Sequence, residues 1–245
     1  MIKVAAPWTG GCDTTFLVWQ LASCGYEVAT YHVDYGNMNH PAEKWAIKHI
    51  YDKLHDAVWN IGKVHPPVEM MYYIPNVRSM WMDGTNSDIH TKNVPNTPTD
   101  INEISRCSWD IPFRNGILFS MGVSFAEGIG VDTLMLQIES DAETMPGSEY
   151  RDDSMAFVDA LNQMCKVGSF VRIECPISDR DVAERYRFAY DLNIHPYVNV
   201  GRCNYPRWLN GSFHPCGKCI TCESSKFILR RDYGTDEFWG RMHED

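Results

Sequence analysis

The stretch Thr9-Gly10-Gly11-Cys12-Asp13-Thr14 decides the fold expected for this chain. It follows a short apolar segment, 2–7, and precedes a helical pattern over 14–24, so it is expected to join a strand to a helix. Such a turn directs backbone N–H groups at one point beside the positive end of the helix dipole. Its glycines permit a close approach, and its threonines supply hydroxyl donors. The stretch therefore predicts a phosphate-binding loop.

The six residues alone also allow a plainer interpretation, an ordinary tight turn. Asp13 would then be the N-cap of the helix, whereas in a phosphate site it can hold Mg²⁺ near the phosphates. The stretch lacks the Gly-Lys-Ser/Thr ending of a Walker A loop and the spacing of a Rossmann dinucleotide motif. The choice between these interpretations therefore depends on the rest of the chain.

Strand and helix patterns alternate along most of the chain. We expect strands at 2–7, 27–33, 57–61, 133–138 and 170–175, and helices at 14–24, around 46–54, and at 114–127, 152–166, 179–192 and 223–231. This alternation predicts an α/β fold with a doubly wound, Rossmann-like parallel sheet. We divide the chain into a main domain, 1–198, with a lid-like insertion at about 74–110, and a C-terminal metal-binding segment, 199–245.

The composition narrows the classes of partner. The chain has 245 residues and a formal net charge of −10, from 32 acidic and 22 basic residues. This balance argues against an extended nucleic-acid surface, because neutralising phosphates needs clustered Lys and Arg. No apolar run approaches the roughly 20 residues that span a bilayer, and the first residues do not resemble a signal peptide. We therefore expect a cytoplasmic protein without direct nucleic-acid or membrane partners.

Four of the nine cysteines lie close together near the C-terminus, at Cys203, Cys216, Cys219 and Cys222. Four thiolates at this spacing predict a closed tetrahedral Zn²⁺ site, which is structural because no position is left for water. A disulfide pair conflicts with the expected reducing compartment, whereas an iron–sulfur cluster stays open on spacing alone. His214 can replace one thiolate as a ligand, but the four cysteines complete the set without it.

Together these motifs resemble the 7-cyano-7-deazaguanine synthases (QueC), which have the PP-loop ATP pyrophosphatase fold. The family's first loop reads S-G-G-x-D-S, and here threonine replaces both serines. The other matches, in chain order, are Asp34-Tyr35-Gly36 with His40 and Glu43, Pro112-Phe113-Arg114-Asn115, Tyr150 with Asp152 and Phe157, and Cys203 with Tyr205 before the C-G-x-C-x-x-C run. Five motifs in the family's order make the resemblance specific over nearly the whole chain.

The chain departs from the family pattern near residue 180. The family's Thr-Lys-x-Glu reads Ser178-Asp179-Arg180-Asp181, so Arg180 is the candidate substitute for the missing lysine. Ser225 stands where the family usually has an arginine. These differences suit a divergent member and leave its substrate open.

The resemblance implies an ATP-dependent ligase that converts 7-carboxy-7-deazaguanine and ammonia to 7-cyano-7-deazaguanine through an adenylated carboxylate. It implies ATP, with Mg²⁺, at residues 9–14 and at Val33, Asp34 and Tyr35, and substrate at Arg114, Asn115, Tyr150, Asp152 and His40. Asp13, Thr14 and Arg114 are the expected catalytic residues, His32 is expected to be a hydrogen-bonded core residue, and Cys203, Cys216, Cys219 and Cys222 the zinc ligands. The family commonly forms homodimers, so we expect one here.

Three alternatives stay open at this point. A QueC-like enzyme can adenylate the deazaguanine carboxylate and transfer it to another amine, such as one on a protein partner. A nucleotide-sensing zinc-ribbon module would bind without turnover. A tRNA-modifying PP-loop enzyme would need a basic face and usually an extra RNA-binding domain, and neither is evident in the sequence.

Overall fold

The computed structural model describes residues 1–35, 37, 39–58, 62–71, 113–138, 152–178 and 181–234. Its centre is a parallel sheet of β1 (Lys3–Pro7), β2 (Glu27–Asp34), β3 (Lys63–Val64), β4 (Val68–Met71), β5 (Thr133–Met135) and β6 (Arg172–Glu174). The strand order is β3-β2-β1-β5-β6, and β4 pairs with β2 farther along the same edge. The predicted parallel sheet is confirmed.

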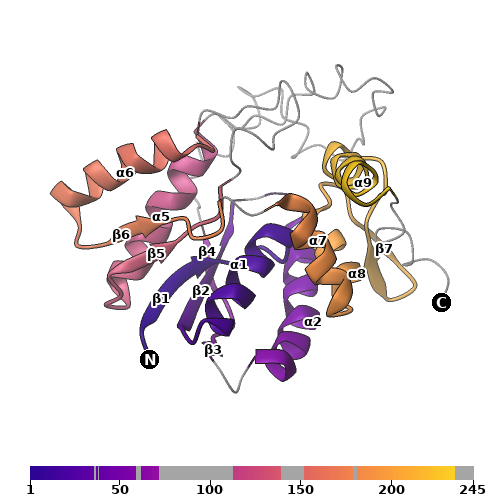
Figure 1. The fold of residues 1–245 in the computed structure, drawn as a ribbon, viewed down its shortest axis with the longest axis horizontal. Coiled ribbons are helices and arrows are strands. Elements are labelled where there is room, and N and C mark those ends of the chain that lie inside the picture. Colours follow the sequence, from indigo (N-terminus) through magenta and orange to yellow (C-terminus); the bar gives the residue numbers. More distant parts are fainter. Residues whose placement is uncertain are drawn as a thin grey trace.

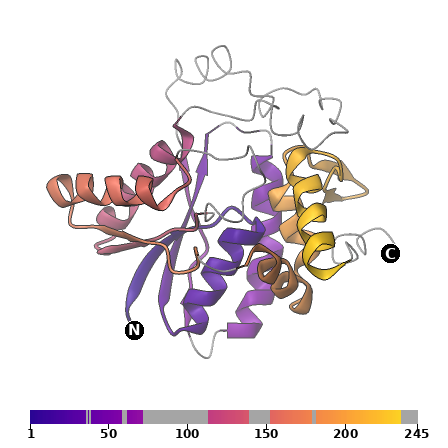
Figure 2. The same cartoon turned by 45° about the horizontal axis from the view of Figure 1, so that its top comes forward.

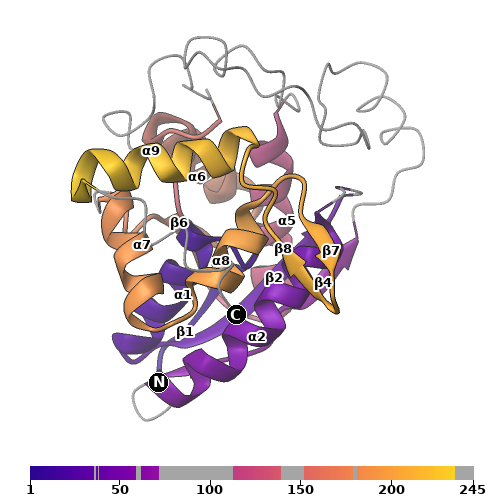
Figure 3. The same ribbon diagram turned by 90° about the vertical axis from the view of Figure 1, so that its right-hand side faces the viewer.

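Helices cover both faces of this sheet (Figures 1 and 2). One face carries α1 (Cys12–Ser23), α2 (His40–Val58), α7 (Val182–Asp191) and α8 (His195–Arg202), and the other carries α5 (Arg114–Gly128) and α6 (Met155–Gly168). Figure 3 shows α9 (Ile220–Tyr233) and the hairpin of β7 (Arg207–Leu209) and β8 (Ser212–His214) outside α7 and α8. The fold is therefore doubly wound, with a C-terminal four-cysteine segment packed on one flank.

The central strand β1 shows why the sheet is buried on both sides. Val4 and Ala6 pack toward α1 and α2, whereas Ala5 packs toward α5. Trp8 follows β1 and is fully buried, and its indole N–H donates to the Thr15 hydroxyl in α1 over 3.1 Å. The loop 9–14 therefore begins directly after the buried Trp8 and leads into α1, to which Trp8 is hydrogen-bonded.

One prediction of local structure is wrong. The strand expected at 57–61 is not formed at its start, because Ala57 and Val58 belong to α2. The apolar face of that helix runs through Ile47, Ile50 and Leu54. The two strands after it that pair with β2 are short, and most of their side chains are exposed, apart from the buried Val64. The helix expected at 14–24 forms as α1, which ends at Ser23, and Cys24 after it is exposed.

The domain division of the sequence stays a prediction. The insertion at about 74–110 lies outside the described residues, and the boundary between 198 and 199 falls inside α8 (His195–Arg202). That helix was not expected from the sequence. Within the described part of the chain, no helix is both long and apolar enough to cross a bilayer.

Candidate nucleotide site and four-cysteine cluster

A cavity of about 350 Å³ lies at the carboxyl ends of β1 and β2, where open parallel sheets bind their ligands. Three predicted motifs meet there. Its lining includes Thr9, Gly11, Asp13 and Thr14 from the loop, Val33 and Tyr35 from the end of β2, and Arg114 and Asn115 from the start of α5. The structure thus brings the loop residues to the same cavity as an arginine that is about 100 positions away in the sequence.

The hydroxyls and backbone donors of the loop converge on the cavity. The Thr9 N–H donates to the Thr14 hydroxyl over 3.1 Å, and the two threonine hydroxyls lie 3.0 Å apart. The Gly11 N–H points at the Thr9 hydroxyl over 3.5 Å. Because α1 begins directly after Gly11, these groups lie at the positive end of its dipole. This arrangement suits a bound anion.

Two loop residues, Gly10 and Cys12, do not line the cavity. Gly10 has φ +74°, and a Cβ there would lie 3.1 Å from the carbonyl oxygen of Glu43 in α2. Glycine is therefore required by both conformation and packing. Cys12 is buried beneath the loop, and burial raises the pKa of its thiol.

Asp13 is held by two arginines from distant helices. Its Oδ1 lies 3.0 Å from Nη1 of Arg185 in α7, and its Oδ2 lies 2.9 Å from Nη1 of Arg202 in α8. Burial favours the neutral carboxyl, but the two guanidinium charges outweigh it and hold the pKa of Asp13 below its usual value. The N-cap of α1 is Gly11, so the plainer interpretation of Asp13 as the N-cap is wrong.

The C-terminal segment supplies one wall of the cavity, and the sequence reasoning missed it. Gly201, Arg202, Asn204 and Thr221 line the cavity. A Cβ on Gly201 would lie 2.4 Å from the carbonyl carbon of Gly10, so α8 packs directly on the loop. The only signal in the sequence was that Arg202 and Asn204 flank Cys203, and that Thr221 stands between two other cysteines.

Tyr35 and Arg114 also line the cavity. Burial raises the pKa of Tyr35 to about 12, although a hydrogen bond and the positive charge of Arg114 oppose this rise. Asp152 does not line the cavity: its carboxylate accepts the Asn115 N–H over 2.9 Å, which places it at the start of α5. Asp153 lines the cavity instead. Tyr150 and Arg180 lie outside the described residues, so their expected roles stay predictions.

His32 and Glu43 form a buried pair on the same cavity. The Nε2 atom of His32 lies 2.7 Å from Oε2 of Glu43, so His32 is hydrogen-bonded as expected, but it also lines the cavity. His40 does not line the cavity; its ring stacks on His32 with centroids 4.7 Å apart, and its Nε2 lies 3.0 Å from Glu69. Asp34 likewise stays outside the lining, with a carboxylate oxygen 3.8 Å from His40.

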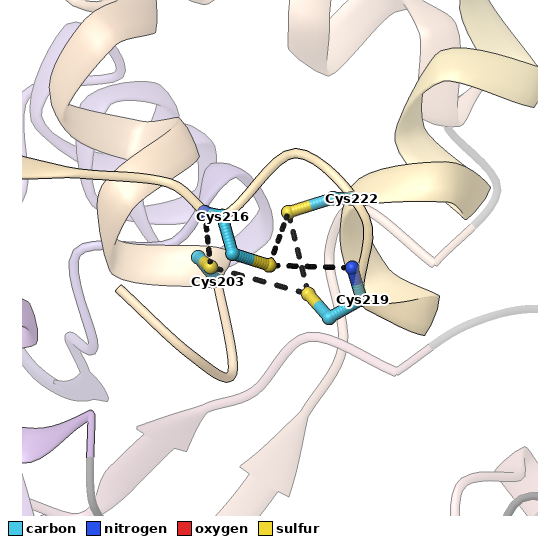
Figure 4. A group of neighbouring side chains, drawn as sticks. All are labelled: Cys203, Cys216, Cys219 and Cys222. Carbon is cyan, nitrogen blue, oxygen red and sulfur yellow. Dashed lines mark hydrogen bonds between the residues drawn. The ribbon is translucent and has the colours of Figure 1, made fainter. Parts of the chain in front are cut away.

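The four cysteines meet in one cluster between α8 and α9 (Figure 4). The Sγ–Sγ distances are 3.9 Å for Cys203–Cys219, 4.0 Å for Cys216–Cys222 and 3.3 Å for Cys219–Cys222. A tetrahedron with metal–sulfur bonds of about 2.3 Å has ligand atoms about 3.8 Å apart. The cluster therefore fits a four-thiolate metal site and suggests zinc, and none of the four is in a disulfide.

Hydrogen bonds among the four cysteines lower the pKa of Cys216 and Cys219 and raise the pKa of Cys203 and Cys222. The hydrogen bond from Cys203 is the main influence that lowers the pKa of Cys216 to about 7. The Cys216 N–H donates to Cys203 Sγ over 3.1 Å, and the Cys219 N–H donates to Cys216 Sγ over 3.3 Å. Backbone N–H groups that donate to sulfur hold metal-binding thiolates in the orientation the metal needs.

Known proteins resemble this chain over almost its whole length. A 7-cyano-7-deazaguanine synthase of Chlorobium phaeobacteroides is 25% identical, covering 87% of this chain and 86% of that protein. One of Methanocaldococcus jannaschii is 26% identical, covering 92% and 93%. A solved 4-thiouridine synthetase–RNA complex with bound ATP has a TM-score of 0.49 and 11% identity, over 97% of this chain and 53% of that one. Residues 4–230 match the model of the queuosine biosynthesis protein QueC, and the chain therefore belongs to the QueC family.

Proposed function

We propose that this protein is an ATP-dependent carbon–nitrogen ligase that converts 7-carboxy-7-deazaguanine and ammonia to 7-cyano-7-deazaguanine. The observation that carries the proposal is the cavity that Thr9, Gly11, Asp13 and Thr14 of the loop line together with Arg114. Relatives at 25% and 26% identity carry the name of this synthase, which supports the same reaction class.

The proposed reaction depends mainly on positioning ATP and the carboxylate and on stabilising the charge that develops between them. A carboxylate is a poor electrophile, so its oxygen is first converted into a leaving group by adenylation. ATP is proposed to enter with Mg²⁺ and to place its phosphates at Thr9, Gly11 and Thr14, where N–H groups, hydroxyls and the helix dipole meet. Fixed donors of this kind stabilise developing charge without reorganising during the reaction.

Arg114 is the proposed partner of the substrate carboxylate or of a phosphate. Its guanidinium can make a bidentate contact with either group, and it lines the same cavity as the loop residues. Asn115, beside it, is the proposed further substrate contact. Val33 and Tyr35 at the end of β2 are proposed to lie along the adenosine, because this is the edge where such sheets hold nucleotides.

The four-cysteine cluster is proposed to hold a structural Zn²⁺. A closed set of four thiolates leaves no open coordination position, so the metal would stabilise the fold without taking part in the reaction. Residues next to the cluster, Arg202 and Thr221, line the cavity. The metal is therefore expected to influence catalysis by holding this wall in place.

The test uses the purified full chain with ATP, Mg²⁺, 7-carboxy-7-deazaguanine and ammonium. We expect AMP, pyrophosphate and the nitrile, measured together by mass spectrometry. Substrate-dependent AMP without amide or nitrile would favour transfer to another amine acceptor and contradict the nitrile synthase. No ATP consumption under any of these conditions would contradict the enzyme and favour a nucleotide-binding module.

A further inference from the structure

We infer that Glu43 is the catalytic base that binds the amine as ammonium and removes its protons, and that His32 is a positioning residue for this carboxylate. The inference rests on the proposed function, because it assigns the amine-side chemistry of the same cavity.

Glu43 is placed beside the reacting groups of the proposed reaction. It lies in the first turn of α2, which packs on the phosphate loop at Gly10. Its side chain and that of His32 are buried, yet both line the cavity that Thr9 and Arg114 share. A ligand at Glu43 would therefore be within the cavity proposed for the activated carboxylate.

The hydrogen bonds of Glu43 leave room for one more donor. Oε2 lies 2.7 Å from Nε2 of His32, in a hydrogen bond whose donor depends on the His32 tautomer, and it accepts from the Asn37 amide over 3.3 Å. Among the described residues, Oε1 accepts from the Asn39 amide alone, over 2.8 Å. A carboxylate offers about four acceptor positions, two on each oxygen. Among the described residues, one position on Oε1 is therefore open to an N–H donor.

The negative charge of Glu43 also favours a cationic ligand. No Lys or Arg among the described residues pairs with Glu43, and its only ion-pair partner there is His32. In the same cavity Asp13 has two arginine partners. A buried carboxylate is costly unless it is paired, so a small cationic ligand would compensate it. Ammonium has this charge and supplies the N–H donor that Oε1 can accept.

A second cavity lies on the other side of His32 from the lining residue Glu43. Its volume is about 260 Å³, it lies between α2 and β4, and among the described residues only His32 lines both cavities. Its lining also includes the half-exposed Glu69, which accepts from His40 and pairs with Lys44. Protons passed from Glu43 to His32 can therefore reach solvent without crossing the nucleotide.

The proposed step balances as follows. The nitrogen arrives as ammonium and ends as an amide NH₂, so it loses two protons. Glu43 takes the first, and the lone pair of ammonia then attacks the carbonyl carbon of the acyl adenylate. The C–N bond forms, the C–O bond to AMP breaks, and its electron pair leaves with AMP. With its own proton on Nδ1, His32 can accept the first proton at Nε2 and release the Nδ1 proton toward solvent, after which Glu43 accepts the second proton from the nitrogen.

The test separates adenylation from amine transfer. Substrate-dependent pyrophosphate exchange into ATP measures adenylation and needs no amine. For Glu43→Gln we expect exchange within about threefold of the original chain but amide formation from ammonium lower by about 100-fold, the usual range for loss of a general base. Hydroxylamine is largely unprotonated at neutral pH, so hydroxamate formation should fall by less than about tenfold.

Two variants serve as controls. Glu27→Gln alters another His–Glu pair, since His65 Nε2 also lies 2.7 Å from Glu27, but this pair is outside both cavities, and we expect no change. Glu43→Asp keeps the negative charge. Its amide formation from ammonium should fall less than in Glu43→Gln, but still more than its hydroxamate formation from hydroxylamine. It also tests the inference if Glu43→Gln fails to fold.

The outcomes distinguish the inference from the proposed function. Equal losses with ammonium and hydroxylamine, or unchanged transfer to ammonium in Glu43→Gln, would overturn the base while leaving the ligase intact. An original chain that shows no substrate-dependent exchange would overturn the proposed function and the inference with it.

Discussion

The two walls of the cavity that meet at Asp13 are built in opposite ways. The loop wall consists of neighbours in sequence, residues 9–14, and it offers N–H groups and hydroxyls. The C-terminal wall comes from α8 and the cysteine segment, and it offers the guanidinium of Arg202, which lies 189 positions from Asp13. The local wall thus supplies the geometry for phosphate, whereas the distant wall supplies positive charge and holds the loop in place.

The difference teaches where the loop obtains its rigidity. The two walls make two contacts. The backbone of α8 at Gly201 packs on the backbone of Gly10, and Arg202 forms an ion pair with Asp13. A loop with two glycines has a high conformational entropy when unfolded, so outside contacts are needed to hold it in one conformation. The C-terminal wall provides those contacts.

The largest effect is expected from a substitution in the four-cysteine cluster, which supports the C-terminal wall of the cavity. Cys219→Ser removes one of four thiolates, and structural zinc in small sites contributes about 10–16 kcal/mol to folding. We expect bound zinc to fall from about one per chain to near zero, with a lower Tm and weaker ATP binding. Metal analysis, thermal unfolding and calorimetric titration measure these changes.

Cys24→Ser is the matched control, because Cys24 is exposed and outside the cluster. It should leave metal content and Tm unchanged. Full zinc content in Cys219→Ser would contradict the four-cysteine site.

The second prediction removes one arginine from Asp13. Arg185→Met takes a fully buried guanidinium from its carboxylate, and breaking a buried pair costs about 3–5 kcal/mol. Urea unfolding measures the loss. Arg187→Met, on the same helix but with an exposed side chain paired to Asp191, should cost less than about 1 kcal/mol. Equal effects of the two substitutions would contradict a special role for Arg185.

The third prediction tests the packing of α8 on the phosphate loop. In Gly201→Ala the new Cβ would lie 2.4 Å from the carbonyl carbon of Gly10, so the loop backbone must move. Misplacement of this kind costs about 100-fold in rate, and we expect pyrophosphate exchange to fall by about that factor. Gly128→Ala adds a Cβ that meets nothing within 4 Å and should leave exchange unchanged. Normal exchange in Gly201→Ala would show that the loop does not need this contact.

The fourth prediction concerns acid. The pKa of Asp13 is lower in the folded protein than in the unfolded chain, so its pairing stabilises the fold above the unfolded value of about 3.9. That contribution is lost as the pH falls through the folded pKa. The unfolding free-energy difference between the original chain and Asp13→Asn should stay constant from pH 7 to about 5 and shrink below about 4. A difference that grows in acid would reverse the assigned sign.

The smallest effect concerns the two threonines of the loop. Thr9→Ser with Thr14→Ser keeps both hydroxyls, which lie 3.0 Å apart, and removes only two methyl groups. The affinity for ATP should change by less than about threefold, because the hydrogen-bond donors are retained. Thr9→Val with Thr14→Val keeps the shape but removes the hydroxyls, and it should weaken ATP binding more. Equal ATP affinities of the two double variants would contradict a role for the two hydroxyls in phosphate binding.

Homodimer formation, cytoplasmic location and the residues that contact ligands stay predictions. So does the role of Asp152, although its hydrogen bond with Asn115 favours a structural contact at the start of α5. These properties depend on a second chain, a cell or a bound ligand.

The sequence by itself determined the parallel sheet, the strand–loop–helix at residues 9–14 and the four-cysteine grouping. Each depends on local patterns: apolar periodicity, glycines between a strand and a helix, and closely spaced thiols. The strand expected at 57–61 shows the limit, because a helix face and a buried strand look alike over so few residues.

Only the tertiary structure decided that Arg185 and Arg202 hold Asp13, that Gly201 packs on Gly10, and that Glu43 and His32 pair on the cavity. The physical reason is that ion pairing and packing depend on separation in space, and residues far apart in the chain carry no local trace of it. Arg187 and Arg185 stand two positions apart on one helix, yet one is exposed and the other lies against the phosphate loop.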